Sequence, residues 1–247
     1  MKKVHFTDLH QHVLWGIDDG PQTRKQMRAL LRQDAENGIE IVFATSHAYP
    51  KTRPFDYKLY RKRLKEANEY CESKGWNLRV LPGCEIHYCS SVADRLAEGK
   101  LPTLGNTRYV LIEFSTEVSM ERISSAADRL YCAGYLPVIA HVERYNRLVR
   151  SPKRAIELRD DYGLLYQVNC DTILHPHGFR ERRFVKKMLE EEAIDAIATD
   201  AHDVQRRPVH MMEAYRKIAR DYDPYYARQL VRLGKKIAKK GQKLLDK

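Results

Sequence analysis

The chain has 247 residues, of which 43% are hydrophobic, so it can bury one substantial core, and we expect a single domain over residues 1–247. No apolar run approaches the length of a bilayer span or a signal-peptide core. We therefore expect a cytoplasmic protein that does not insert into a membrane. The five cysteines contain no C-x-x-C pair, which argues against a disulfide framework and a thiolate zinc site.

The formal net charge of +11 is concentrated in the C-terminal region. Residues 206–247 hold thirteen Lys and Arg against four Asp and Glu, which leaves a surplus of only two for the first 205 residues. Such an asymmetry indicates either an acidic partner or a solvated helix face. Aromatic interleaving and nucleic-acid motifs are missing, so we expect no nucleic-acid partner.

Hydrophobic patterns predict strands and helices that alternate from the N-terminus. Residues 4–8 form the first strand, and residues 22–37 place apolar side chains at helical spacing until Gly38 stops the helix. Six more strands are predicted over residues 39–45, 78–82, 108–114, 135–140, 163–168 and 193–199. The remaining helices include a long charged one ending near residue 73, and others over residues 91–98, 118–133, 152–161 and 179–192.

Seven short apolar strands that alternate with helices predict a parallel α/β fold, and their regularity favours a barrel over an open doubly wound sheet. No Gly-rich dinucleotide or P-loop signature follows any strand, which argues against Rossmann and NTPase folds. From about residue 209 the chain is basic and helical. Its apolar stripe predicts helices packed on the barrel, with a membrane-surface or partner-docking role as the alternative. The stripe comprises Tyr226, Leu230, Val231, Ile237, Ala238, Leu244 and Leu245.

Ligand-type side chains stand at or just beyond every predicted strand end except the sixth. His10 and His12 are two residues apart, so on a strand they face the same way, and Asp19 follows in a loop with two glycines. All strand carboxyl ends of a parallel barrel meet at one face, so these side chains should converge there. Imidazoles and carboxylates without thiolates suit Mn, Fe or Zn. The other members are His47, Glu85, Glu113, His141, Asp200 and His202.

The carboxylates in this set indicate how many ions it would hold. Asp19, Glu85, Glu113 and Asp200 bring four negative charges, which two divalent ions would only neutralise. Three ions would leave a surplus of positive charge that suits a phosphate dianion. Arg144 and Arg207 follow the same strand ends, and a guanidinium can bind two phosphate oxygens at once.

Seven segments carry a family resemblance through their order and spacing: DLHQHVLWGIDDGP, TSHAYP, LPGCEIHY, VLIEFS, VIAHVERYNRL, QVNC and TDAHDVQRRP. The chain resembles the polymerase and histidinol phosphatase (PHP) superfamily. Within it, the chain is similar to the bacterial capsule-type tyrosine-protein phosphatases. The similarity runs from Asp8 to about Met211, and the DDGP and AH-x-ER elements are specific to that branch.

The resemblance implies a distorted TIM-like (β/α)7 barrel with three divalent ions, usually manganese, with iron or zinc as alternatives. It implies Arg144 and Arg207 as phosphate-binding residues. It further implies a tyrosine-phosphorylated bacterial kinase or its tail as the partner, in capsule or exopolysaccharide synthesis. The implied metal ligands are His10, His12, Asp19, His47, Glu85, Glu113, His141, Asp200 and His202.

The expected chemistry is hydrolysis of phosphotyrosine by a metal-activated hydroxide, with Arg144 and Arg207 holding the phosphoryl group. A tyrosine phenolate, whose conjugate acid has a pKa of about 10, leaves more readily than an alkoxide. Asp200 or a water on the metal would supply the proton that the leaving group needs. Asp8 is expected to orient one of the histidines.

Three other functions compete with this one. Cys89 and Arg95 match the C-x5-R spacing of cysteine-based tyrosine phosphatases, but no glycine lies between them and the segment leads into a predicted helix. The second is a small-molecule phosphatase of the histidinol-phosphate type. The third is a nucleic-acid-associated PHP nuclease or binding module.

Overall fold

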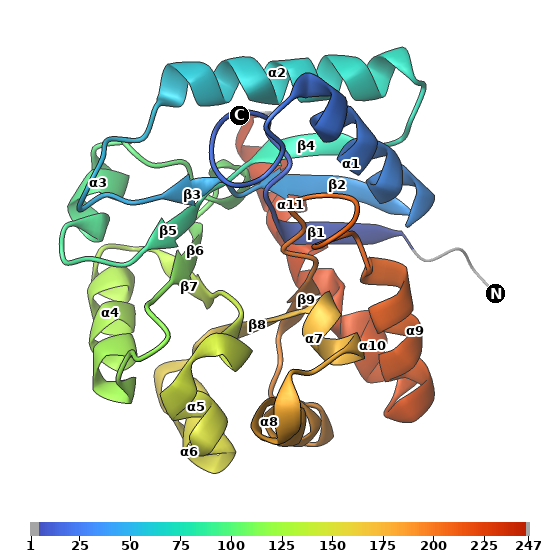
Figure 1. The fold of residues 1–247 in the computed structure, drawn as a ribbon. Coiled ribbons are helices and arrows are strands. Elements are labelled where there is room, and N and C mark those ends of the chain that lie inside the picture. Colours follow the sequence, from blue (N-terminus) through green and yellow to red (C-terminus); the bar gives the residue numbers. More distant parts are fainter. Residues whose placement is uncertain (1–4, 246–247) are drawn as a thin grey trace.

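Short apolar segments form nine strands in the computed structural model, which describes residues 5–245, and every pairing between them is parallel (Figure 1). Most strand residues are buried, as expected for a sheet covered on both faces. The strands are β1 Phe6–Gln11, β2 Ile39–Ala44, β3 His47–Ala48, β4 Arg79–Pro82, β5 Glu85–His87, β6 Tyr109–Glu113, β7 Leu136–Ile139, β8 Leu165–Asn169 and β9 Ala196–Ala198.

The strands curl into a distorted barrel. One sheet has the order β1-β2-β4 and the other the order β3-β5-β6-β7-β8-β9. A parallel bridge between Gln11 and Ala201 joins the two sheets beside β9. The predicted parallel α/β barrel is therefore confirmed.

The structure corrects three details of the predicted strands. The short strands β3 and β5 were not predicted, because two or three residues are too few to show a period of two. Each follows a predicted strand after a break of two residues. The first strand was predicted over residues 4–8, but it runs on to Gln11, and residue 4 lies outside the described residues.

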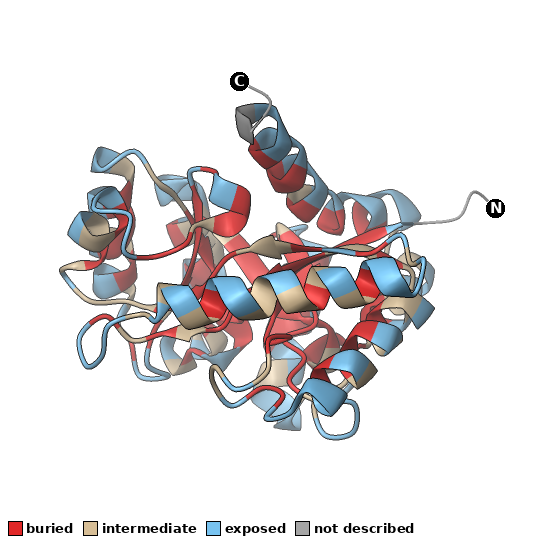
Figure 2. Cartoon of the chain, turned by 90° about the horizontal axis from the view of Figure 1, so that it is seen from above, coloured by how far each residue is buried: buried red, intermediate tan, exposed pale blue. Residues whose placement is uncertain are grey.

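Helices cover the outside of the barrel and bury their apolar faces against it (Figures 1 and 2). The first of them begins at a capping box in which the Thr23 side chain accepts from the backbone N–H of Gln26. The helices of the described residues are α1 Arg24–Glu36, α2 Tyr57–Ser73, α3 Val92–Ala97, α4 Met120–Cys132, α5 Asn146–Arg150, α6 Pro152–Tyr162, α7 Cys170–Leu174, α8 Gly178–Glu190, α9 Met211–Asp221, α10 Pro224–Leu230 and α11 Arg232–Leu245, of which α11 packs differently. No helix within residues 5–245 is both long and apolar enough to cross a bilayer.

The helix α11 packs on the barrel interior, as its apolar stripe predicted. Ile237 and Ala238 join a buried cluster with Leu9, Phe43 and Leu111 of the strands. The same helix contacts β1, β9 and the 3-10 turn η1 (Leu104–Asn106). Tyr226, Leu230 and Val231 of the stripe are also buried, whereas the side chains of residues 244 and 245 lie outside the described part.

A glycine allows the close approach of α11 to the barrel. A Cβ atom on Gly241 would collide with the backbone carbonyl oxygen of Gly105 in η1. Backbone atoms cannot move aside as a flexible side chain can, so this contact requires a residue without a side chain.

We expect Gly241→Ala to lower the free energy of unfolding by about 1–3 kcal/mol through overpacking. The alanine would otherwise raise stability by about 1 kcal/mol through its helix propensity, so the sign of the change tests the contact. Urea denaturation gives the measurement. The exposed neighbour Gln242, changed to alanine, serves as the control and should change stability by less than about 0.5 kcal/mol. A stabilised Gly241→Ala protein would contradict this packing.

Candidate metal centre

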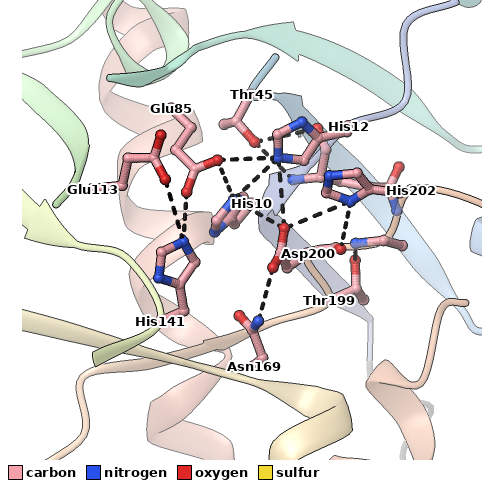
Figure 3. A network of polar contacts seen from close by, with 12 residues as sticks. His10, His12, Thr45, Glu85, Glu113, His141, Asn169, Thr199, Asp200 and His202 are labelled. Carbon is pink, nitrogen blue, oxygen red and sulfur yellow. Dashed lines mark hydrogen bonds and ion pairs between the residues drawn. The ribbon is translucent and has the colours of Figure 1, made fainter. Parts of the chain in front are cut away.

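All nine side chains that the sequence predicts as ligands converge at the carboxyl ends of the strands. Figure 3 shows His10, His12, Glu85, Glu113, His141, Asp200 and His202 among them. They form four overlapping groups in which the candidate ligand atoms lie within 4.8 Å of one another. The groups are His12, Asp19, His47 and His202; His10, His141 and Asp200; His10, His12 and Glu85; and His47, Glu85 and Glu113. Glu85 is shared by two of them.

Strand register brings these residues together. His10 lies in β1, and His12 follows just after its end, so their rings lie side by side with centroids 5.5 Å apart. The short strands that the sequence did not reveal place His47 of β3 opposite Glu85 of β5. Glu113 ends the next strand, β6. The two unpredicted strands thus align three of the ligands.

Two candidate ligands have strained backbones. His141 has a φ of 33° and Asp200 a φ of 51°, in the left-handed region that non-glycine residues rarely adopt. Both residues are buried, and each stands two residues beyond the end of a strand, β7 for His141 and β9 for Asp200. Such conformations cost about 1–3 kcal/mol each and are typical of functional sites.

Several buried oxygen and nitrogen atoms of the candidate ligands form no hydrogen bonds and would be free to bind metal ions. The second oxygen of Glu85, Oε2, makes no hydrogen bond, although nitrogens of His10, His12 and His47 lie 3.3, 3.2 and 3.0 Å from it. Two further buried atoms, Oε1 of Glu113 and Nε2 of His202, also lack hydrogen bonds. Buried polar atoms normally have partners, and each of these atoms belongs to a residue of the candidate ligand groups. The set is therefore suited to divalent cations.

The buried carboxylates of Glu85 and Asp200 have cationic side chains as close neighbours. Burial disfavours the ionised form of Glu85, but the neighbouring imidazoles, first among them His10, hold its pKa well below the usual value. Burial likewise opposes ionisation of Asp200, and His10, Arg144 and Arg207 lower its pKa. Both carboxylates are therefore ionised and available as ligands.

Asp19 and Asp18 have different roles in the loop after β1. Asp19 is 61% exposed, and its Oδ1 lies 3.4 Å from Nε2 of both His47 and His202, in the first ligand group. Asp18 is buried and accepts from the ring of His12 at 2.8 Å. Burial alone would raise the pKa of Asp18, but His12 lowers it to about 2. Asp18 thus orients a ligand from behind.

Sequence reasoning missed Gln167 and Asn169, which lie two residues apart on β8. The Gln167 carbonyl oxygen lies 3.0 Å from Nδ1 of His10 and accepts from the backbone N–H of His141 at 2.9 Å. Its amide donates to Asn169, whose own amide donates to Asp200 at 2.8 Å. The predicted strand that has no candidate ligand at its end therefore supports three ligands from other parts of the rim. The sequence did contain a signal for them: two polar residues two apart in an apolar strand point to the same face of the sheet.

Asp8 does not orient a histidine ring, contrary to expectation. It accepts from the backbone N–H of His10 and from the backbone N–H and hydroxyl of Thr199. Burial raises its pKa to about 6. Asp8 thus ties β1 to the segment after β9, and it contacts no imidazole in the described residues.

Arg144 and Arg207 lie on the rim beside Asp200. A terminal nitrogen of each guanidinium donates to the same oxygen, Oδ2 of Asp200, with 2.7 Å from Arg144. Their side chains are 40% and 35% exposed, so both can face the cluster and the solvent. The two predicted phosphate-contacting residues are therefore adjacent to each other and to the ligands.

The cysteine pattern builds no thiolate phosphatase site. Cys89 contacts the hydroxyl of Ser91, and Arg95 lies on α3, with its Nε 3.4 Å from the same hydroxyl. A phosphate-binding loop around a reactive thiolate needs converging backbone amides and a glycine-rich turn. The intervening residues instead lead into α3.

Known proteins match this chain along most of its length. The family model for capsular polysaccharide synthesis proteins, CpsB/CapC, matches residues 6–237. Tyrosine-protein phosphatase CpsB of Streptococcus pneumoniae is 32% identical over 228 residues, which are 90% of this chain and 93% of that protein. Tyrosine-protein phosphatase YwqE of Bacillus subtilis is 28% identical over 219 residues, 87% and 84% of the two chains.

A solved structure agrees with these matches. The crystal structures described as those of YwqE and CpsB, metal-dependent tyrosine phosphatases, superpose with a TM-score of 0.87 at 26% identity and cover 94% of both chains. The resemblance that the sequence motifs carry is thereby confirmed. This protein belongs to the CpsB/CapC family of capsular polysaccharide synthesis proteins.

Proposed function

We propose that this protein is a metal-dependent tyrosine-protein phosphatase that hydrolyses phosphotyrosine. The convergence of five imidazoles and four carboxylates on one rim, beside two arginines, carries the proposal. Its relatives CpsB and YwqE are named tyrosine-protein phosphatases and are described as metal-dependent. A cytoplasmic tyrosine-phosphorylated kinase of capsule or exopolysaccharide synthesis, or its tail, is the partner that we propose.

Three divalent ions, most simply Mn²⁺, are proposed for the site, with Fe or Zn as alternatives. The ligands are nitrogen and oxygen atoms without sulfur, which suits these metals. Glu85 supports a multinuclear site, because its Oε2 lies near three imidazoles and its Oε1 lies 2.6 Å from Nε2 of His141. Both oxygens of Glu85 would therefore be available as metal ligands beside these imidazoles.

The ions would supply a nucleophile at neutral pH and positive charge for the transferring oxygens. Arg144 and Arg207 bind the phosphoryl group, and Asp200 holds both guanidinium groups in position through Oδ2. The lowered pKa keeps Asp200 ionised, so we assign it ligation and positioning rather than proton donation. A phenolate leaving group, with a conjugate-acid pKa of about 10, needs little protonation.

One comparison of substrates distinguishes this function from its rivals. The metal-loaded protein would be assayed with a phosphotyrosine peptide, histidinol phosphate and single-stranded DNA. We expect the highest kcat/KM on the phosphotyrosine peptide. Preferred turnover of histidinol phosphate would favour the small-molecule phosphatase. Strongly salt-dependent DNA binding without peptide hydrolysis would favour the nucleic-acid module.

We expect Arg144→Ala to lower kcat/KM on phosphotyrosine by about 100-fold, or about 2.7 kcal/mol, because it removes a charged donor to the transition state. Arg144→Lys should recover little of the lost kcat/KM, since an ammonium group cannot form the bidentate hydrogen bonds of a guanidinium. The metal content should not change. Arg150→Ala, a change at an exposed arginine of α5, should retain full activity. Equal losses in the Arg144 and Arg150 variants would argue against a specific phosphate contact.

We expect Asp19→Ala to reduce the metal content by about one ion per chain before it affects the fold, because its exposed carboxylate serves one ligand group. Metal analysis of the purified protein and thermal unfolding give the two readouts. The control is Asp128→Ala, at an exposed aspartate of α4. Full metal content in the Asp19 variant would remove this residue from the ligand set.

We expect Cys89→Ser to keep turnover nearly intact, because Cys89 contacts a serine hydroxyl rather than a catalytic group. Steady-state kinetics on the phosphotyrosine peptide provides the test. A loss of several hundredfold, the scale on which catalytic groups act, would instead support cysteine catalysis.

A further inference from the structure

A cleft of about 480 Å³ lies beside the metal centre and is lined by residues that the proposed chemistry does not use. Its walls come from the loop after β3, the end of β5 and the helices α3 and α4, which lie on the same side of the barrel (Figure 1). We call it the side cleft, and its principal lining residues are Lys51, His87, Tyr88, Arg95, Phe114 and Arg122.

The side cleft opens directly next to the candidate ligands. Nδ1 of His87 lies 3.5 Å from Oε1 of Glu113, and His87 pairs with Glu113 in the register of β5 and β6. The ring of Tyr49 lies 5.3 Å from that of His47 and 5.8 Å from that of His87. A peptide that presents a phosphotyrosine to the centre would therefore pass the cleft with its neighbouring residues.

The described lining of the side cleft carries positive charge and no carboxylate. Lys51, Arg95 and Arg122 all line it, and no aspartate or glutamate does. Within residues 5–245, none of these three cations forms an ion pair with a carboxylate. Elsewhere on the surface, arginines such as Arg159 are neutralised by neighbouring aspartates. The cleft is thus complementary to an anionic ligand.

The guanidinium groups are positioned by their neighbours. Nε of Arg95 lies 3.4 Å from the hydroxyl of Ser91, and Arg122 lies over the ring of Tyr88 at 5.7 Å. The Tyr88 and Phe114 rings, with centroids 5.4 Å apart, add apolar surface. Such a cleft can hold an anionic group between cations and the hydrocarbon part of its side chain against aromatic rings.

We propose that the side cleft binds an anionic side chain, a carboxylate or a second phosphate, within about three residues of the phosphotyrosine, a span of about 10 Å in an extended peptide. This inference rests on the proposed function, because it selects among phosphotyrosine peptides. Arg95 and Arg122 are its specificity-determining residues. They bind the flank of the peptide and leave the chemistry of the phosphoryl group unchanged.

The test compares kcat/KM on peptides that share one phosphotyrosine and differ at a single flanking position. One series carries glutamine or glutamate at each of the three positions on either side, and another carries a non-hydrolysable phosphotyrosine analogue there. We expect at least one acidic position to raise kcat/KM by about fivefold at low salt, mainly through KM. The preference should fall as salt screens the charges. The series with glutamate tests for a carboxylate in the cleft, and the series with the phosphotyrosine analogue tests for a second phosphate.

The variants Arg95→Ala and Arg122→Ala should each remove most of this preference while leaving turnover of phenyl phosphate and of the neutral peptide unchanged. Arg122→Glu should transfer the preference to a peptide with lysine at the same position. Arg216→Ala, at an exposed arginine of α9 outside the cleft, is the matched control and should behave like the unmodified protein.

Two results would overturn the inference alone: equal kcat/KM for neutral and acidic peptides in the unmodified protein, or equal losses on both peptides in the Arg95 and Arg122 variants. Failure to hydrolyse any phosphotyrosine peptide would contradict the proposed function itself, and the inference with it. The two failures are therefore distinguishable by whether the neutral peptide is turned over.

Discussion

The mutual attraction of buried imidazoles and carboxylates is the interaction on which the site depends. Glu85 and Asp200 are almost fully buried, and an ionised carboxylate in such a place is costly without a cationic partner. Neighbouring imidazoles and two arginines lower the pKa of these carboxyl groups and so favour their ionised form. Divalent ions would add positive charge beside the same carboxylates, so the arrangement is suited to binding metal.

The rest of the barrel holds this cluster in place. Gln167 and Asn169 connect His10, His141 and Asp200 through one chain of hydrogen bonds, and Asp18 fixes the ring of His12. Strained backbone at two ligands costs free energy that packing elsewhere must offset. The helix α11 contributes to that packing by closing the barrel interior with Ile237 and Ala238.

The sequence predicted the barrel and the convergence of the site because both follow from local patterns. Short apolar strands with ligand-type residues at their ends need only parallel pairing to meet at one face. Choosing Asp19 over Asp18 required the family resemblance, since spacing alone treats the two alike. The roles of Gln167 and Asp8 depend on partners up to 157 and 191 residues away, which no local pattern records. The side cleft likewise joins three separate stretches of the chain.

We propose that the nine candidate ligands together hold several metal ions, and that this centre performs the hydrolysis. Its most direct test measures metal content and phosphotyrosine turnover in the same samples, after chelation and after re-addition of Mn²⁺. We expect no turnover in the stripped protein and recovery as the metal content approaches about three ions per chain. Unchanged turnover in protein freed of metal would contradict it.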